Sequence, residues 1–212
     1  MVQACMWCGG VAMNVELWLI RHGETAWSLS GAHTSRTDIP LTEHGRKRAE
    51  ELRQYMRNTT FERVMVSPMQ RARETCEIAG LAANARIEEG LREWDYGESE
   101  GKTTQEMRAH YGKRDWSVWT DEIVGGETVE QVGERADQVI ARALGSSGAD
   151  ADASAKAALF AHAHILRILA ARWIGLDARS GRLLGLGTGS VSVLGWERST
   201  RIISHWNRSF EE

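Results

Sequence analysis

Short apolar runs that alternate with helical segments constrain the fold of this chain more than any other feature. The runs at 15–20, 64–66 and 157–161 have the length and composition of buried strands. Segments with the apolar spacing of amphipathic helices lie between them. Strands that alternate with helices form a mostly parallel sheet covered on both faces. We therefore predict an α/β fold, a three-layer α/β/α sandwich with a mostly parallel central sheet.

The expected helices carry signals at their N-terminal ends. Thr42 is a candidate N-cap, and Ser67-Pro68 has the pattern of an N-cap followed by proline at the first helical position. Thr128-x-x-Gln131 has the spacing of a capping box. The predicted elements are helices at 43–57, 69–81 and 129–143, a helix after the strand at 157–161, and an edge hairpin formed by 190–196 and 200–206.

Composition is typical of one globular domain. The chain has 212 residues, 42% of them hydrophobic, and a formal net charge of -3. This charge gives no overall basic field, so we expect no nucleic-acid partner, and no apolar stretch has the length of a membrane span. We predict a single domain over 13–212 with a cap-like, aromatic segment at about 90–126. The sequence leaves open whether the protein forms a homodimer.

Residues 1–12 are interpreted as an extension outside the domain. Met13 begins the run that leads into the first strand, and the preceding residues lack the basic region of a secretory signal. Cys5 and Cys8 have C-x-x-C spacing, but no second Cys/His pair at ligand spacing accompanies them. We therefore expect a cytoplasmic protein with no metal site and no cofactor.

Charged and imidazole side chains follow two of the predicted strands. Arg21 and His22 come directly after the first strand, and His162 follows the third. Arg71 lies in the first turn of the helix after the second strand, and Glu93 follows further along the chain. Ligands bind at the carboxyl ends of strands in open α/β sheets, so the pattern predicts an anion site with a nucleophilic histidine there. We expect the glycine after His22 to let the backbone approach a ligand closely.

Each of these side chains alone also fits an ordinary role. Arg71 fits a surface helix, Glu93 fits a solvated loop carboxylate like Glu98 and Glu100, and His162 fits a structural core histidine. Their combination on matched strand ends favours the functional interpretation. The other histidines have no such context and are interpreted as structural or surface residues: His33, His44, His110 and His205.

From about Val15 to Asn207, the chain resembles the histidine phosphatase superfamily, which has the phosphoglycerate-mutase-like fold. The motifs that carry this resemblance are Arg21-His22-Gly23-Glu24-Thr25, Thr37-Asp38-Ile39-Pro40-Leu41-Thr42, Ser67-Pro68-Met69-Gln70-Arg71-Ala72-Arg73-Glu74-Thr75, Leu91-Arg92-Glu93 and Ala161-His162-Ala163-His164-Ile165-Leu166-Arg167. One motif is weak, whereas all of them in this order are specific.

The resemblance implies a role for each matching residue. His22 resembles the nucleophile that becomes phosphohistidine, and Glu93 resembles the proton donor. Arg21, Arg71 and His162 resemble the phosphate pocket. The remaining candidates for substrate binding are Ser28, Thr34, Ser35, Arg36, Ala163 and His164, and Arg182 is a further candidate for a distal phosphate or hydroxyl groups.

These residue types suit phosphoryl transfer. A phosphoryl group in transfer spreads negative charge over its oxygens, and guanidinium groups bind those oxygens in pairs. The attacking imidazole must be neutral, which adjacent arginines favour, and Glu93 would need a raised pKa to protonate the leaving oxygen. The expected substrate is a small phosphorylated metabolite, such as a sugar phosphate or bisphosphate, with side-chain cations in place of a metal.

Two departures from the family pattern stand in the motifs. Relatives usually have glycine where this chain has Ala163, and many have Thr-Gly where this chain has Thr34-Ser35. A methyl group at position 163 would narrow the pocket, or strain the backbone if φ there is positive. Three alternatives to a metabolite phosphatase stay open: a phosphoglycerate mutase, a non-catalytic phosphate-binding module and a protein-tyrosine phosphatase. The short region after the Glu93 motif favours hydrolysis over the mutase reaction.

Overall fold

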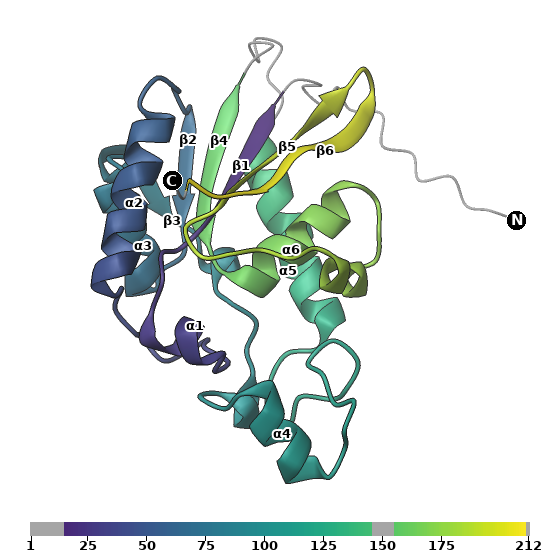
Figure 1. Cartoon of the computed structure of the whole chain (residues 1–212). Coiled ribbons are helices and arrows are strands. Elements are labelled where there is room, and N and C mark those ends of the chain that lie inside the picture. The colour runs from purple at the N-terminus through teal and green to yellow at the C-terminus, as the bar shows by residue number, and fades with distance from the viewer. Residues whose placement is uncertain (1–14, 146–154, 211–212) are drawn as a thin grey trace, which may run out of the picture.

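A six-stranded sheet forms the centre of the computed structural model, which describes residues 15–145 and 155–210 (Figure 1). Its strand order is β3-β2-β4-β1-β5-β6. The first four of these strands are mutually parallel, β5 is antiparallel to β1, and β6 is antiparallel to β5. The strands are β1 (Glu16–Arg21), β2 (Arg63–Val66), β3 (Ala85–Ile87), β4 (Lys156–Ala161), β5 (Val191–Glu197) and β6 (Thr200–Arg208).

Helices cover both faces of the sheet, as Figure 1 shows. Alternate residues of β1 point to opposite faces. Trp18 and Ile20 pack in the cluster that includes α2 and α3, whereas Leu17 and Leu19 pack in the cluster that includes α5 and α6. The predicted three-layer sandwich is confirmed. The helices are α1 (Ala26–Ser30), α2 (Glu43–Met56), α3 (Gln70–Ile78), α4 (Thr104–Tyr111), α5 (Val129–Leu144) and α6 (Ala163–Trp173), with 3₁₀ helices at Ala82–Asn84, Glu89–Leu91, Gly97–Ser99 and Ala178–Leu183.

The predicted N-caps have different outcomes. Thr42 caps α2 by accepting from the Gly45 amide, and Thr128 forms the capping box of α5 with Gln131. The prediction for Ser67 is wrong, because α3 begins at Gln70 and Met69 occupies its N-cap position. The Ser67 hydroxyl instead lies within hydrogen-bond distance of His162.

Two short elements were missed by the sequence patterns. Strand β3 has three residues at the edge of the sheet, of which Ala85 is partly buried and the other two are exposed, so it shows no apolar run. Helix α1 has five residues and buries none of them, so it lacks an apolar stripe. Its capping box is formed by Thr25 and Ser28.

The aromatic segment at 90–126 contains α4 and the 3₁₀ helix Gly97–Ser99. Figure 1 shows α4 beyond the sheet edge from which β1 runs into α1. Trp94, Tyr96, Trp116 and Trp119 are all buried, and they join the same hydrophobic cluster as α5 and α6. The segment is therefore fixed to the sandwich by its aromatic side chains. Within the described residues, no helix has both the length and the hydropathy needed to cross a bilayer.

Candidate active site

Two neighbouring parallel strands deliver His22 and His162 to the same edge of the sheet. Strands β1 and β4 pair in register, with Arg21 opposite Ala161, so the residue after each strand is a histidine. The two imidazole rings lie 5.1 Å apart between centroids, and both are buried. The structure thus brings together the two histidines that the sequence placed 140 positions apart.

His22 has one ring nitrogen free for chemistry. Its Nδ1 lies 2.7 Å from the Gly23 carbonyl oxygen, which can only accept a hydrogen bond, so Nδ1 carries the proton. Burial lowers the pKa of His22 well below the usual value, and the charges of Arg21 and Arg71 lower it further. The ring is therefore neutral, with the lone pair on Nε2.

His162 has both ring nitrogens engaged by the protein. Arg71 Nε donates to its Nδ1 at 3.1 Å, so in the neutral ring the proton is on Nε2. Nε2 then donates to the Ser67 hydroxyl at 2.8 Å. Burial lowers the pKa of His162 well below its usual value, and Arg71 acts in the same direction. Ser67, which lies at the end of β2, is a site residue that the sequence pattern assigned to a helix cap.

Arg71 holds the loop between α1 and α2. It is fully buried, and its terminal nitrogens donate to the carbonyl oxygens of Thr34, Ser35 and Thr37 at 3.1–3.3 Å. Arg71 and His162 are absent from the lining of the cavity at this edge, whereas Arg21 and His22 are part of it. The residues of the predicted phosphate pocket thus fall into two pairs. Arg21 and His22 line the cavity, and Arg71 and His162 contact the residues around it.

Glu93 accepts hydrogen bonds from three backbone amides. Its carboxylate oxygens receive the amides of Trp94, His164 and Ile165 at 2.9–3.0 Å. The last two belong to the first turn of α6, where amide groups lack partners within the helix and attract negative charge. Glu93 is therefore fixed at the N-terminus of the helix that follows His162.

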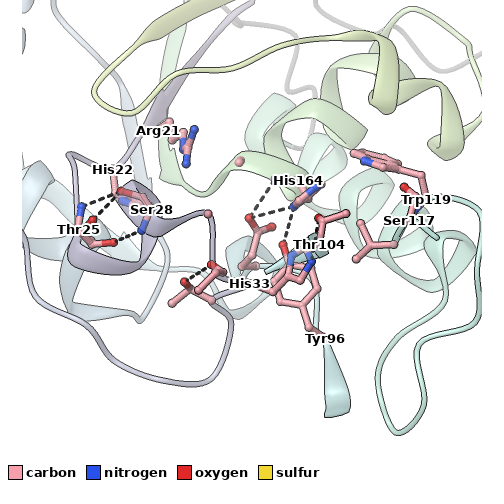
Figure 2. Close-up of a pocket in the computed structure, with 16 residues that line it drawn as sticks. Arg21, His22, Thr25, Ser28, His33, Tyr96, Thr104, Ser117, Trp119 and His164 are labelled. Carbon is pink, nitrogen blue, oxygen red and sulfur yellow. Dashed lines mark hydrogen bonds and ion pairs between the residues drawn. The ribbon is translucent and has the colours of Figure 1, made fainter. Parts of the chain in front are cut away.

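A cavity of about 340 Å³ opens beside His22 (Figure 2). The Arg21 guanidinium lines it, with one terminal nitrogen donating to the Leu186 carbonyl oxygen. The Arg21 Nε is buried and has no partner among the described residues. A guanidinium in this lining can bind the oxygens of an anion placed beside His22. The other predicted site residues that line the cavity are Ser28, Thr34, Glu93, Ala163 and His164.

Ala163 fits its position without backbone strain. It is the first residue of α6, and it is absent from the non-glycine residues with positive φ. Its methyl group lines the cavity. Alanine in place of the usual glycine therefore narrows the pocket and does not strain the backbone.

Three of the predicted substrate contacts are not brought to the cavity. The Ser35 amide donates to Glu100, and its hydroxyl donates to the Glu93 carbonyl oxygen at 3.4 Å. The Arg36 guanidinium is paired with Asp95, and the Arg182 side chain is exposed. None of the three lines the cavity.

Three other interpretations from the sequence require correction. Glu100 is not a solvated loop carboxylate, because it accepts the amides of Ser35 and Thr37 and so orders the loop. His33 lines the cavity, which its sequence context did not indicate. A Cβ at Gly23 would lie 2.4 Å from the Gly45 carbonyl oxygen, so this glycine permits the close approach of α2 rather than of a ligand.

Within 15–145 and 155–210, no group of three or more His, Cys, Asp or Glu side chains is arranged to hold a metal ion. Cys5 and Cys8 lie outside the described residues.

The fold and this edge define an α/β protein with a cavity lined by an arginine and a neutral histidine. The chain belongs to the histidine phosphatase superfamily (branch 1), whose family model matches residues 17–209. It is 38% identical over 191 residues to a Mycobacterium tuberculosis acid phosphatase, covering 89% of this chain and 90% of the relative. It is 34% identical to the Saccharomyces cerevisiae sedoheptulose 1,7-bisphosphatase, covering 76% and 68% respectively.

Solved structures agree on the fold. The structure of a Mycobacterium tuberculosis open reading frame product superimposes with a TM-score of 0.82 at 36% identity, covering 92% of this chain and 97% of the other. A mycobacterial glucosyl-3-phosphoglycerate phosphatase superimposes with a TM-score of 0.81 at 23% identity, covering 92% and 99%, which supports the shared fold alone.

Proposed function

We propose that the protein is a phosphomonoester hydrolase that acts through a phosphohistidine on a small phosphorylated metabolite, a sugar phosphate or bisphosphate. The observation that carries this proposal is the neutral His22, with its Nε2 free, in a cavity that Arg21 also lines. Membership of the family and its named phosphatases support it. Side-chain cations supply the positive charge.

The first step transfers the phosphoryl group to His22. The Nε2 lone pair forms a bond to phosphorus while the bond from phosphorus to the ester oxygen breaks. Glu93 in its acid form donates a proton to that oxygen, and the product leaves as an alcohol. Arg21 stabilises the charge on the phosphoryl oxygens.

The second step returns His22 to its starting state. A water molecule attacks the phosphorus atom and gives a proton to the Glu93 carboxylate, and the phosphorus–nitrogen bond breaks. Inorganic phosphate and neutral His22 result. The Gly23 carbonyl oxygen accepts a hydrogen bond from the Nδ1–H of His22 in both steps. This bond stabilises the positive charge that the ring acquires while it is phosphorylated.

Arg71 and His162 act from behind His22 in this proposal. The Arg71 charge favours the neutral form of the nucleophile, and its bonds to Thr34 and Thr37 hold the loop that borders the cavity. His162 Nε2 donates to Ser67 until a phosphoryl oxygen comes within reach. The two residues are therefore positioning residues in the free protein.

The test is phosphate release from p-nitrophenyl phosphate and a panel of sugar phosphates in the presence of EDTA. We expect turnover that His22→Ala abolishes, and a ³²P label that stays on the native protein after a rapid base quench and is lost on treatment with acid, as a phosphohistidine requires. His110→Ala, an exposed position, is the matched control. Transfer of phosphate to an added sugar acid in preference to water, or release that persists in His22→Ala, would overturn the proposal.

A further inference from the structure

The distal half of the cavity is built from uncharged polar groups, although the proposed substrates include bisphosphates. Building on the proposed function, we infer that this half selects an uncharged, hydroxyl-rich leaving group and disfavours a second phosphate. The preferred substrate is then a monophosphate of a polyol or sugar. Figure 2 shows the two ends, with His22, Thr25 and Ser28 on one side and His33, Tyr96 and His164 on the other.

Positive charge is confined to one end. Arg21 is the sole Lys or Arg among the 16 lining residues, all of which lie in the described part of the chain. One guanidinium beside His22 is placed to bind the phosphate under attack. A second phosphate at the distal end would have no cation of its own.

Two other arginines around the cavity, Arg167 and Arg36, are committed to protein partners. Arg167 donates from Nε to the Gly181 carbonyl oxygen at 3.1 Å and from a terminal nitrogen to the Arg182 carbonyl oxygen at 3.0 Å. Its guanidinium lies over the Trp119 ring, 4.7 Å from the centroid. Arg36 is paired with Asp95.

The distal polar groups suit hydroxyl groups as partners. The Tyr96 hydroxyl lies 2.5 Å from His164 Nδ1, and the Thr104 hydroxyl lies 3.5 Å from His33 Nε2. Ser117 adds another hydroxyl to the lining. Hydroxyl and neutral imidazole groups donate and accept, as sugar hydroxyls do. Specific recognition by such groups penalises a ligand that leaves them unpaired.

The acid–base properties of these groups support a neutral surface. Burial lowers the pKa of His33 to about 4 and lowers that of His164 well below its usual value. Burial and the charge of Glu93 raise the pKa of Tyr96 well above its usual value. All three side chains are therefore uncharged at neutral pH.

The experiment compares matched substrate pairs. Phosphate release is measured from glucose 6-phosphate and glucose 1,6-bisphosphate, and from fructose 6-phosphate and fructose 1,6-bisphosphate, with p-nitrophenyl phosphate as the test of turnover itself. We expect kcat/KM for each monophosphate to exceed that for its bisphosphate at least tenfold. Equal values, or a preference for the bisphosphates, would overturn the inference.

A charge placed in the distal end should reverse the preference. Thr104→Lys adds a cation to the lining and should raise the bisphosphate-to-monophosphate ratio of kcat/KM at least fivefold. Gln105→Lys, the next residue of α4, is exposed and outside the lining, and it should leave the ratio unchanged. Equal changes in the two variants would contradict the inference, because a general increase in charge would then explain them.

A binding measurement separates this inference from the proposed function. If the native protein fails to hydrolyse any compound, including p-nitrophenyl phosphate, the proposed function fails. Calorimetric titration of His22→Ala with the same sugar pairs then decides the selectivity. Tighter binding of the monophosphates supports the inference, and tighter binding of the bisphosphates overturns it.

Discussion

The ends of β1 and β4 are alike in sequence and position but differ in what surrounds each histidine. His22 donates from Nδ1 to the next carbonyl oxygen and keeps Nε2 free, whereas His162 has partners on both nitrogens. Neighbouring parallel strands therefore place two imidazoles at one edge but prepare only one of them for attack. The two histidines differ less in position than in whether the protein engages the second ring nitrogen. Nε2 of His22 is left free for the proposed attack, whereas both nitrogens of His162 are bonded and it acts as a positioning residue in the proposal.

The largest test of this comparison is removal of each histidine in turn. We expect His22→Ala to lower kcat at least about 10⁴-fold, because no other lone pair replaces Nε2. His162→Ala should lower it about 10²-fold, since it removes support and one potential donor. Single-turnover kinetics checks both, with thermal unfolding to establish that each variant is folded. Equal losses would break the comparison.

Glu93 connects the second strand end to the proposed proton transfer. Glu93→Gln keeps the shape of the side chain but removes the transferable proton, so we expect kcat to fall about 10²–10³-fold for sugar phosphates. The loss should be smaller for p-nitrophenyl phosphate, whose leaving group needs less protonation. The ratio of the two losses is the measurement, and a ratio near one would remove the general-acid role.

The residues after the histidines, Gly23 and Ala163, extend the comparison to stability. A Cβ at Gly23 would meet the Gly45 carbonyl oxygen at 2.4 Å, so Gly23→Ala should lower the free energy of unfolding by about 3 kcal/mol. Ala163→Gly should cost only about 0.5–1 kcal/mol, the ordinary penalty of glycine in a helix. Urea unfolding measures both. Similar costs would show that the two strand ends are packed alike.

His33 tests whether burial keeps a loop histidine neutral, as it does the two strand-end histidines. The pKa of His33 is about 4 in the folded protein and about 6.5 in the unfolded chain. As pH falls below about 6.5, the unfolded chain binds a proton that folded His33 does not, so stability is lost toward pH 4. Between pH 7.5 and 5, native protein should lose about 2 kcal/mol more than His33→Gln.

Urea unfolding at both pH values measures that difference. His110→Gln reports the effect of removing an exposed histidine. Parallel losses in the native protein and His33→Gln would show that folding does not depress the pKa of His33.

Much of the fold was predictable because strand and helix patterns repeat over several residues. Strands at 15–20, 64–66 and 157–161 were each placed within one residue of β1, β2 and β4 at either end. β3 escaped because a three-residue edge strand buries too little to show a pattern. Ser67 was misassigned because the dipeptide Ser67-Pro68 fits a helix start, and only the fold shows that His162 competes for the hydroxyl.

The site was predictable where a residue follows a strand and unpredictable where a loop folds back. Arg21, His22 and His162 required only the position of strand ends. The contacts of Glu100 and the place of His33 depend on how the loop before α2 meets the segment at 90–126. The local sequence around Glu100 and His33 shows no pattern that predicts this contact. Both residues were therefore interpreted as ordinary polar positions.

The carboxylate of Glu93 has a consequence for hydrogen exchange. Amides in the first turn of a helix have no intrahelical acceptor and ordinarily exchange with solvent quickly. In α6 the amides of His164 and Ile165 are bonded to a side chain that comes from 71 and 72 positions earlier in the chain. Slow deuterium uptake at these two amides therefore requires the 90–126 segment to be docked. The exchange rate of the two amides measures that docking in the absence of any substrate.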